Sequence, residues 1–398
     1  MRNKFLCGTV LLLSSLICAQ VSQESANASV LQDAAQALTA GNLGRAESDL
    51  RSVLRVAPED CRGLDLLGVV RVLQKREIEA EELFRRALQN KPDFAPAHAH
   101  LGLLYVQNGH IEEADRQLRE ALRIDPARSD ASAALVRILQ DQARASAAAG
   151  EPEKALASLI EARKYLPANP DVQFEFGTIA LQMSLWQDAV EAFQRTLKLR
   201  NNDPVALYDL GRAFMGLSQF EDARQQFARY VEVRPDEASG HCALGMTLAA
   251  LQRVPEARKH FERSIMLDPA QNESFFRLGL IDLDAENLDE AARNLRLVLA
   301  RDSKHAGALS ALGRVAFKQK RYSQAIYLLQ QAIASDSSWR EAHYYLGLAF
   351  ARVGRKEEAN DQINIATQLE HGEVERRRTV FKIPESSAGD PRGSPQQK

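Results

Sequence analysis

The chain has 398 residues, of which 45% are hydrophobic and only 6% are aromatic. Its 51 basic and 53 acidic residues leave a formal net charge of −2. This balance argues against a nucleic-acid binder, which usually carries a basic stripe or a high isoelectric point.

The first residues have the three parts of a secretory signal peptide. Arg2 and Lys4 form a positively charged start, residues 5–17 form an apolar run, and Ala19 is a small residue suited to cleavage. The apolar run is shorter than the roughly 20 residues that a membrane-spanning helix needs. The sequence therefore predicts an exported protein, periplasmic or extracellular, that has no integral membrane span.

This interpretation assigns residues 1–19 to the signal peptide and residues 20–26 to a short linker. An uncleaved anchor is one alternative. Lipidation of Cys18 is another, and it ranks second because Ile17 is bulkier than the small residue that lipoprotein signals prefer at this place.

A glycine recurs at intervals of 34 residues, and an alanine follows each glycine twelve residues later. The glycines are Gly68 and Gly102, then Gly177, Gly211, Gly245, Gly279, Gly313 and Gly347. A fixed period of this length is typical of a solenoid, in which each unit packs only on its neighbours.

The unit over residues 204–237 predicts two antiparallel helices. Leu207, Gly211 and Phe214 recur at helical spacing and share one face of a first helix. A second helix contains Ala223, and Pro235 ends it because proline cannot continue a helix. Glycine and alanine allow the two helices to cross closely, and a bulky residue four positions after the alanine fills the space beside the crossing.

These residues resemble the tetratricopeptide repeat, a 34-residue helix–turn–helix unit. The motif of the family is seen in Leu67, Gly68, Ala80, Phe84, Ala87 and Pro92. The resemblance implies an all-α fold, a right-handed superhelical solenoid of about ten helix–turn–helix repeats. The solenoid would cover residues 27–373, with repeats starting at residues 27, 61, 95, 129, 170, 204, 238, 272, 306 and 340.

One repeat is longer than the others. Ala143 takes the glycine position in this repeat, and its distance from Gly102 is seven residues longer than the 34-residue period. Residues 129–149 therefore predict a lengthened first helix. Seven residues add about two helical turns, roughly 10 Å. The addition either makes a step in the solenoid wall or is an insertion without a role.

Beyond the repeats, residues 374–398 contain a short basic and apolar piece followed by a Pro-, Ser- and Gly-rich end. That composition predicts a disordered tail. The basic and apolar piece is expected to cap the last repeat, with a docking peptide as the alternative.

No catalytic motif, cofactor-binding pattern or metal-ligand spacing is present in the sequence. His98, His241 and His343 share the fourth position of their repeats, which in this family is usually a packing position. We therefore expect structural histidines, no cofactor, no metal and no enzymatic activity.

In this family the first helices line a groove, and the resemblance implies that partners bind there. Positions five, nine and twelve of the repeats supply aromatic, methionine and arginine side chains. The candidate groove residues are Phe174, Tyr208, Arg212, Met215, Met246, Phe276, Arg314, Phe317 and Tyr344. Such a surface suits a polypeptide with some negative charge, unless several of these side chains pack between neighbouring repeats.

The sequence favours a non-enzymatic, exported scaffold that binds protein or peptide partners in this groove. The resemblance implies support of a cell-envelope assembly or secretion complex. The alternative is an accessory of polysaccharide export or cell-wall machinery that contacts glycans directly. Self-association through the groove is compatible with either hypothesis.

Overall fold

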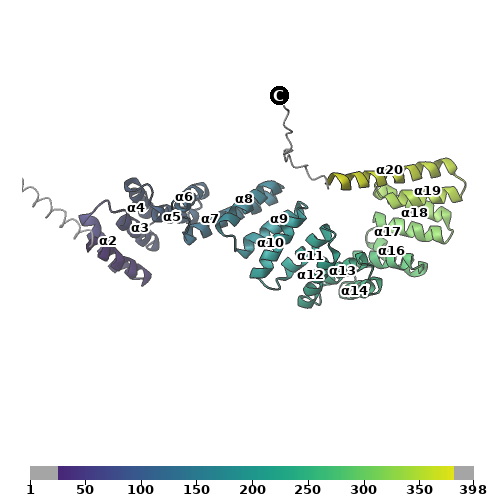
Figure 1. The fold of residues 1–398 in the computed structure, drawn as a ribbon, viewed down its shortest axis with the longest axis horizontal. Coiled ribbons are helices and arrows are strands. Elements are labelled where there is room, and N and C mark those ends of the chain that lie inside the picture. Colours follow the sequence, from purple (N-terminus) through teal and green to yellow (C-terminus); the bar gives the residue numbers. More distant parts are fainter. Residues whose placement is uncertain (1–25, 381–398) are drawn as a thin grey trace, which may run out of the picture. The chain divides into compact units, whose positions relative to one another are not determined.

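The computed structural model describes residues 26–380, which form helices joined by short turns and contain no strand (Figure 1). The predicted all-α repeat fold is therefore confirmed. The predicted signal peptide and most of the predicted tail lie outside the described residues. The chain divides into two units, Met1–Asn201 and Asn202–Lys398. No helix in the described part is long and apolar enough to cross a membrane.

The first unit opens with a helix over residues 26–39. It continues with α2 (Leu43–Val56), α3 (Cys61–Leu73), α4 (Glu77–Asn90), α5 (Ala95–Gln107), α6 (Ile111–Ile124), α7 (Ser129–Ala148), α8 (Pro152–Tyr165), α9 (Pro170–Gln182) and α10 (Trp186–Leu199).

The second unit is built in the same way. Its helices are α11 (Pro204–Gly216), α12 (Phe220–Val233), α13 (Ala238–Ala250), α14 (Val254–Leu267), α15 (Asn272–Asp284), α16 (Leu288–Arg301), α17 (Ala306–Lys318), α18 (Tyr322–Ser335), α19 (Arg340–Arg352) and α20 (Lys356–Val380).

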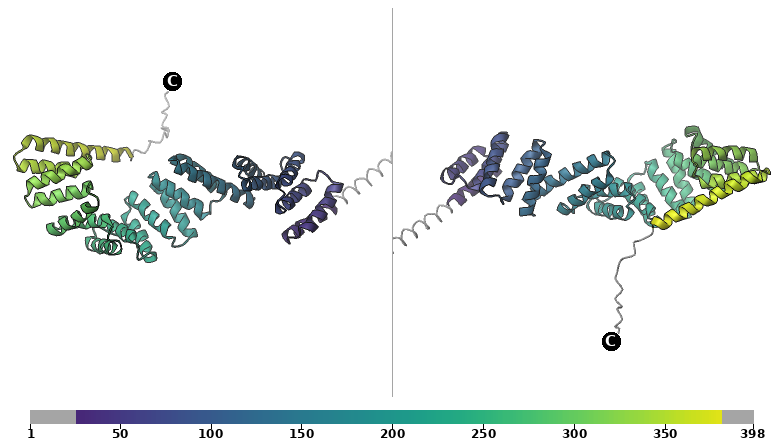
Figure 2. Two further views of the ribbon diagram at one scale, coloured as in Figure 1. Left: turned by 180° about the vertical axis from the view of Figure 1, so that it is seen from behind. Right: turned by 90° about the horizontal axis from the view of Figure 1, so that it is seen from above.

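Each repeat pairs a first helix with a second helix, as seen in the row of hairpins in Figure 2. In α3 and α4 these helices have 13 and 14 residues. The repeated glycine lies where the two helices meet. A Cβ atom placed on Gly68 would come within 2.5 Å of the ring of Phe84, a residue with no exposed surface. At Gly102 the equivalent neighbour is Leu118, at 2.8 Å. The expected close crossing, with a bulky residue filling the space beside it, is confirmed.

The turn inside each hairpin uses one residue with a left-handed backbone. Gly109 and Gly150 adopt it with φ of 76°, which glycine tolerates without strain. Lys75 and Ser218 adopt the same conformation, with φ of 60° and 58°, although they carry side chains. These turns therefore store backbone strain that glycine would relieve.

The lengthened helix predicted from the spacing is also confirmed, because α7 has 20 residues where the first helices of the neighbouring repeats, α5 and α9, have 13. At the other end of the repeats, α20 has 25 residues and continues past Glu373 to Val380. It thus takes in the start of the segment predicted as a cap or tail.

The three histidines at the fourth repeat position link elements of the fold, which confirms their structural role. His98 Nε2 donates to the carbonyl oxygen of Pro92 at 2.8 Å, and its Nδ1 lies 2.7 Å from Gln117 Oε1. His343 makes the equivalent pair of contacts, with Ser337 and Gln362.

The third histidine differs in its partner on the second helix. His241 Nε2 donates to the carbonyl oxygen of Pro235 at 3.0 Å, as its two counterparts do. Its Nδ1 lies 3.0 Å from Nδ1 of His260, where the other two repeats have glutamine. A hydrogen bond between these two nitrogens requires that one carries a hydrogen and the other does not. The contact therefore depends on which tautomer each ring adopts.

Candidate functional site

The nine candidate groove residues all lie on first helices. Phe174 belongs to the first unit and the other eight to the second. Only Arg212 and Tyr344 have well-exposed side chains. Phe276 is 7% exposed and belongs to the core, so it is not available to a partner.

The candidates on α11 mainly hold the hairpin together. The ring of Tyr208 packs against Phe227 and Tyr230 of α12 at centroid distances of 5.5 and 5.1 Å, and its burial raises its pKa. Arg212 donates to Asp209 Oδ1 at 3.0 Å. Burial raises the pKa of Asp209, and the hydrogen bond from Arg212 reverses part of this rise.

Three candidates on α17 and α19 come together around Tyr345, which the sequence analysis had not singled out. The guanidinium of Arg314 lies 5.1 Å from the centre of the Tyr345 ring, within cation–π range. Phe317 and Tyr344 contact the same ring edge-on, at 6.0 and 5.4 Å. Tyr344 is 42% exposed, whereas the side chain of Arg314 is only 14% exposed and pairs with Asp284 and Glu341. The cluster therefore presents mainly the aromatic ring of Tyr344 on the second unit.

A pocket lies beside the lengthened helix in the first unit. It is a cavity of about 310 Å³ between α7 and α9. Its lining residues are Ala143, Arg144 and Ala147 of α7, Leu159 of α8, and Phe174, Glu175, Thr178, Ile179 and Gln182 of α9. The sequence predicted the lengthened helix and Phe174 separately, and the structure places them at one pocket.

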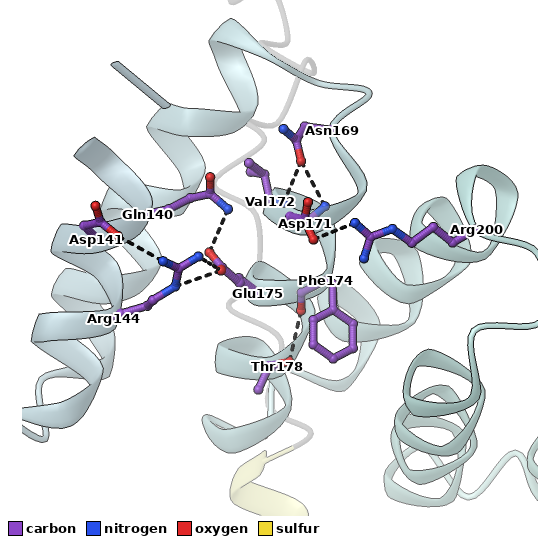
Figure 3. Close-up of polar contacts among 10 residues, drawn as sticks. All are labelled: Gln140, Asp141, Arg144, Asn169, Asp171, Val172, Phe174, Glu175, Thr178 and Arg200. Atoms are coloured by element: carbon purple, nitrogen blue, oxygen red, sulfur yellow. Dashed lines mark hydrogen bonds and ion pairs between the residues drawn. The ribbon is translucent and has the colours of Figure 1, made fainter. Parts of the chain in front are cut away.

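A hydrogen-bonded network holds the charged edge of this pocket (Figure 3). Arg144 donates Nε and Nη2 to Glu175 Oε1 at 3.0 and 2.6 Å, and Nη1 to Asp141 Oδ1 at 2.9 Å. Gln140 donates to the other carboxylate oxygen of Glu175 at 3.1 Å. The bonds to Glu175 raise the pKa of Arg144, so this guanidinium stays protonated.

The first turn of α9 is fixed separately. Asn169 caps the helix, because its Oδ1 accepts from the backbone N–H groups of Asp171 and Val172 at 2.9 and 3.2 Å. Asp171 also accepts from Arg200 Nη2 at 2.6 Å. The ring of Phe174 meets Phe193 of α10 edge-on at 5.8 Å. The α9 side of the pocket is therefore anchored before any ligand binds.

Over the described range, no group of three or more His, Cys, Asp or Glu side chains is placed to hold a metal ion. The pocket and the aromatic cluster offer shape, apolar contact and charge, which are the features of a recognition surface.

The comparison with known proteins agrees with this architecture. The tetratricopeptide repeat pattern matches residues 34–93, 141–204, 208–272 and 276–338, and a second form of the pattern matches residues 72–138. The chain therefore belongs to the tetratricopeptide repeat family, as its sequence motifs suggested. Proteins of this family bind protein or peptide partners.

One relative is the type IV pilus assembly protein PilF of Pseudomonas aeruginosa, which is 34% identical. The similarity covers 27% of this chain and 54% of PilF, so the chain spans about half the length of that relative.

Solved structures with similar folds have lower identities. MamA from Desulfovibrio magneticus RS-1 is 21% identical with a TM-score of 0.41, over 43% of this chain and 96% of MamA. Yeast Tom70 is 13% identical with a TM-score of 0.39, over 91% of this chain and all of the Tom70 chain.

Proposed function

We propose that this protein is an exported, non-catalytic scaffold that holds protein partners on the surfaces of its first helices. The observation that carries the proposal is the repetition itself, because helical hairpins of a partner-binding family occupy residues 26–380. A repeat array offers an extended recognition surface instead of one enclosed active site.

The proposed setting is a cell-envelope assembly or secretion complex. Two observations support it. The N-terminal sequence has the organisation of a secretory signal, and a relative carries the name of a type IV pilus assembly protein. The scaffold would position one or more components of such an assembly while they join it.

Export is tested by fusing residues 1–26 to alkaline phosphatase, which is active only after export. The proposal expects phosphatase activity from this fusion. It expects none from a matched fusion in which an Arg replaces a residue in the middle of the apolar run. Equal activity from both fusions, or none from either, would remove export from the proposal.

Partner binding is tested by crosslinked affinity capture from the native host with the full chain. The informative variant is Tyr344→Ala, because Tyr344 is exposed and belongs to the aromatic cluster. Tyr327→Ala is the matched control, since Tyr327 is 60% exposed on a second helix. The scaffold proposal expects a partner that the first variant loses and the second retains. Equal retention in both variants would move the site away from the second unit's first helices.

A further inference from the structure

The lengthened helix α7 forms one wall of the pocket in the first unit. The 20 residues of α7 place Ala143 at the position that glycine takes elsewhere. Three residues of α7 line the pocket, and two of them, Ala143 and Ala147, have small side chains. These small side chains leave space for a cavity of about 310 Å³.

The interior of the pocket suits an apolar group. Five of its nine lining residues are apolar, and Leu159 and Ile179 among them are buried. The hydroxyl of Thr178 donates to the carbonyl oxygen of Phe174 at 3.0 Å, so its hydrogen is already used within α9. A volume near 300 Å³ is at the small end for ligand pockets, so it matches a bulky side chain better than a large cofactor.

The guanidinium of Arg144 at the edge of this pocket can still donate hydrogen bonds to a ligand, although Asp141 and Glu175 balance its charge. Glu175 is one of two charged lining residues, but its side chain is only 22% exposed and both its carboxylate oxygens accept hydrogen bonds. Arg144 is the other, and its side chain is 60% exposed. It uses three of its five N–H groups on Glu175 and Asp141, and the remaining two have no partner among the described residues.

Arg144 is also held in position before binding, since Asp141 and Glu175 fix its guanidinium from two sides. A fixed guanidinium with two free N–H groups matches a carboxylate, which accepts two hydrogen bonds in parallel. Less side-chain freedom is lost on binding when the donor is already ordered.

We propose that this pocket binds an internal segment of a partner protein that carries a bulky apolar residue beside an acidic one. The apolar side chain fills the cavity between α7 and α9, and the neighbouring carboxylate pairs with Arg144. This inference rests on the proposed scaffold function and specifies the partner chemistry at one place on it.

The test uses a display library of random twelve-residue peptides that is selected on the full chain, and binding of the enriched peptides is then compared between the wild type and an Ala147→Leu variant. Leucine at this position fills the cavity and keeps a good helix-forming residue in α7. Ala145→Leu is the matched control, because Ala145 is an exposed α7 residue that does not line the pocket. We expect enriched peptides to pair Phe, Leu, Ile or Met with a neighbouring Asp or Glu.

Synthetic versions of the enriched peptides, blocked at both ends, then give the binding constants. Ala147→Leu should raise Kd by about tenfold or more, since a buried side chain loses its place. Arg144→Gln should raise Kd by about three- to tenfold, as expected for a partly exposed charged contact. Arg137→Gln, an exposed position two turns earlier on α7, should leave Kd unchanged.

Exchanging the peptide's acidic residue for its amide should raise Kd by the same factor as Arg144→Gln. The two changes together should raise Kd little further than either change alone. Helicity and melting temperature of every variant are measured, so that a folding defect is recognised.

Three results would overturn the inference. Enriched peptides that bind Ala147→Leu as well as wild type would leave the scaffold proposal standing and place the site elsewhere. Enriched peptides without an acidic residue, or indifferent to Arg144→Gln, would refute the assigned charge. If no peptide is enriched, the pocket inference fails, while crosslinked capture decides separately whether the protein binds partners.

Discussion

The contact between Gly68 and Phe84 gives the sharpest prediction about stability. A methyl group on Gly68 would lie 2.5 to 2.9 Å from three atoms of the Phe84 ring, which has no exposed surface and nowhere to move. Overpacking of this kind costs about 1–3 kcal/mol. Alanine recovers about 1 kcal/mol through its higher helix propensity. Gly68→Ala should therefore lower the free energy of unfolding by up to about 2 kcal/mol.

Gly44→Ala is the matched control, because a Cβ atom on this helical glycine would meet nothing within 4 Å. This variant should be stabilised by up to about 1 kcal/mol. The comparison isolates the steric cost, which is measured by urea unfolding followed by circular dichroism. In a Phe84→Ala background the clash disappears, so Gly68→Ala should become stabilising there. If Gly68→Ala and Gly44→Ala stabilise the wild type equally, the account of helix crossing is wrong.

Three further predictions concern backbone strain and pH. Ser218 has a left-handed backbone with φ of 58°, so Ser218→Gly should raise the free energy of unfolding by about 0.5–1 kcal/mol, measured by urea unfolding. Burial, and then the neighbouring His241, lower the pKa of His260 in the folded protein. The neutral ring therefore makes its full contribution to stability above the usual histidine pKa, and this contribution is lost as the pH falls below that value. The urea midpoint should fall between pH 7.5 and 5.5, and His260→Gln should reduce that fall; an unchanged pH dependence would refute the assignment. Hydrogen bonds, first from Arg71, lower the pKa of Glu47 to about 2, so acid titration should remove its contribution between about pH 5 and 2, and Glu47→Gln should reduce this acid sensitivity.

The hairpin architecture could be predicted from the sequence because its requirements are local and steric. Only a very small residue fits at Gly68 against Phe84, so the same residue types recur at fixed spacing. The lengthened helix was predictable for the same reason, since Ala143 shifts the register by seven residues. The spacing did not reveal the turns at Lys75 and Ser218, because a left-handed turn tolerates residues other than glycine at a modest cost in strain.

The candidate site was less predictable, because exposure of a first-helix side chain depends on the neighbouring repeat. Phe276 was expected in the groove, but its ring inserts toward α17, where Gly307 leaves room for it; a Cβ atom on Gly307 would lie 2.8 Å from the ring. Tyr345 was missed because its role depends on Arg314 and Phe317 of the preceding repeat. The pocket could not be predicted from the repeat spacing, because side chains of α7, α8 and α9 form its lining together.

Site-specific photo-crosslinking in the native host shows whether partners bind on the surfaces of the first helices. A photoreactive phenylalanine is placed at Thr178 in the pocket, at Tyr344 in the aromatic cluster, or at the exposed Tyr327 on α18. We expect crosslinks to a discrete partner from Thr178 or Tyr344 and none from Tyr327. Crosslinks from Tyr327 alone, or from none of the three positions, would contradict this expectation.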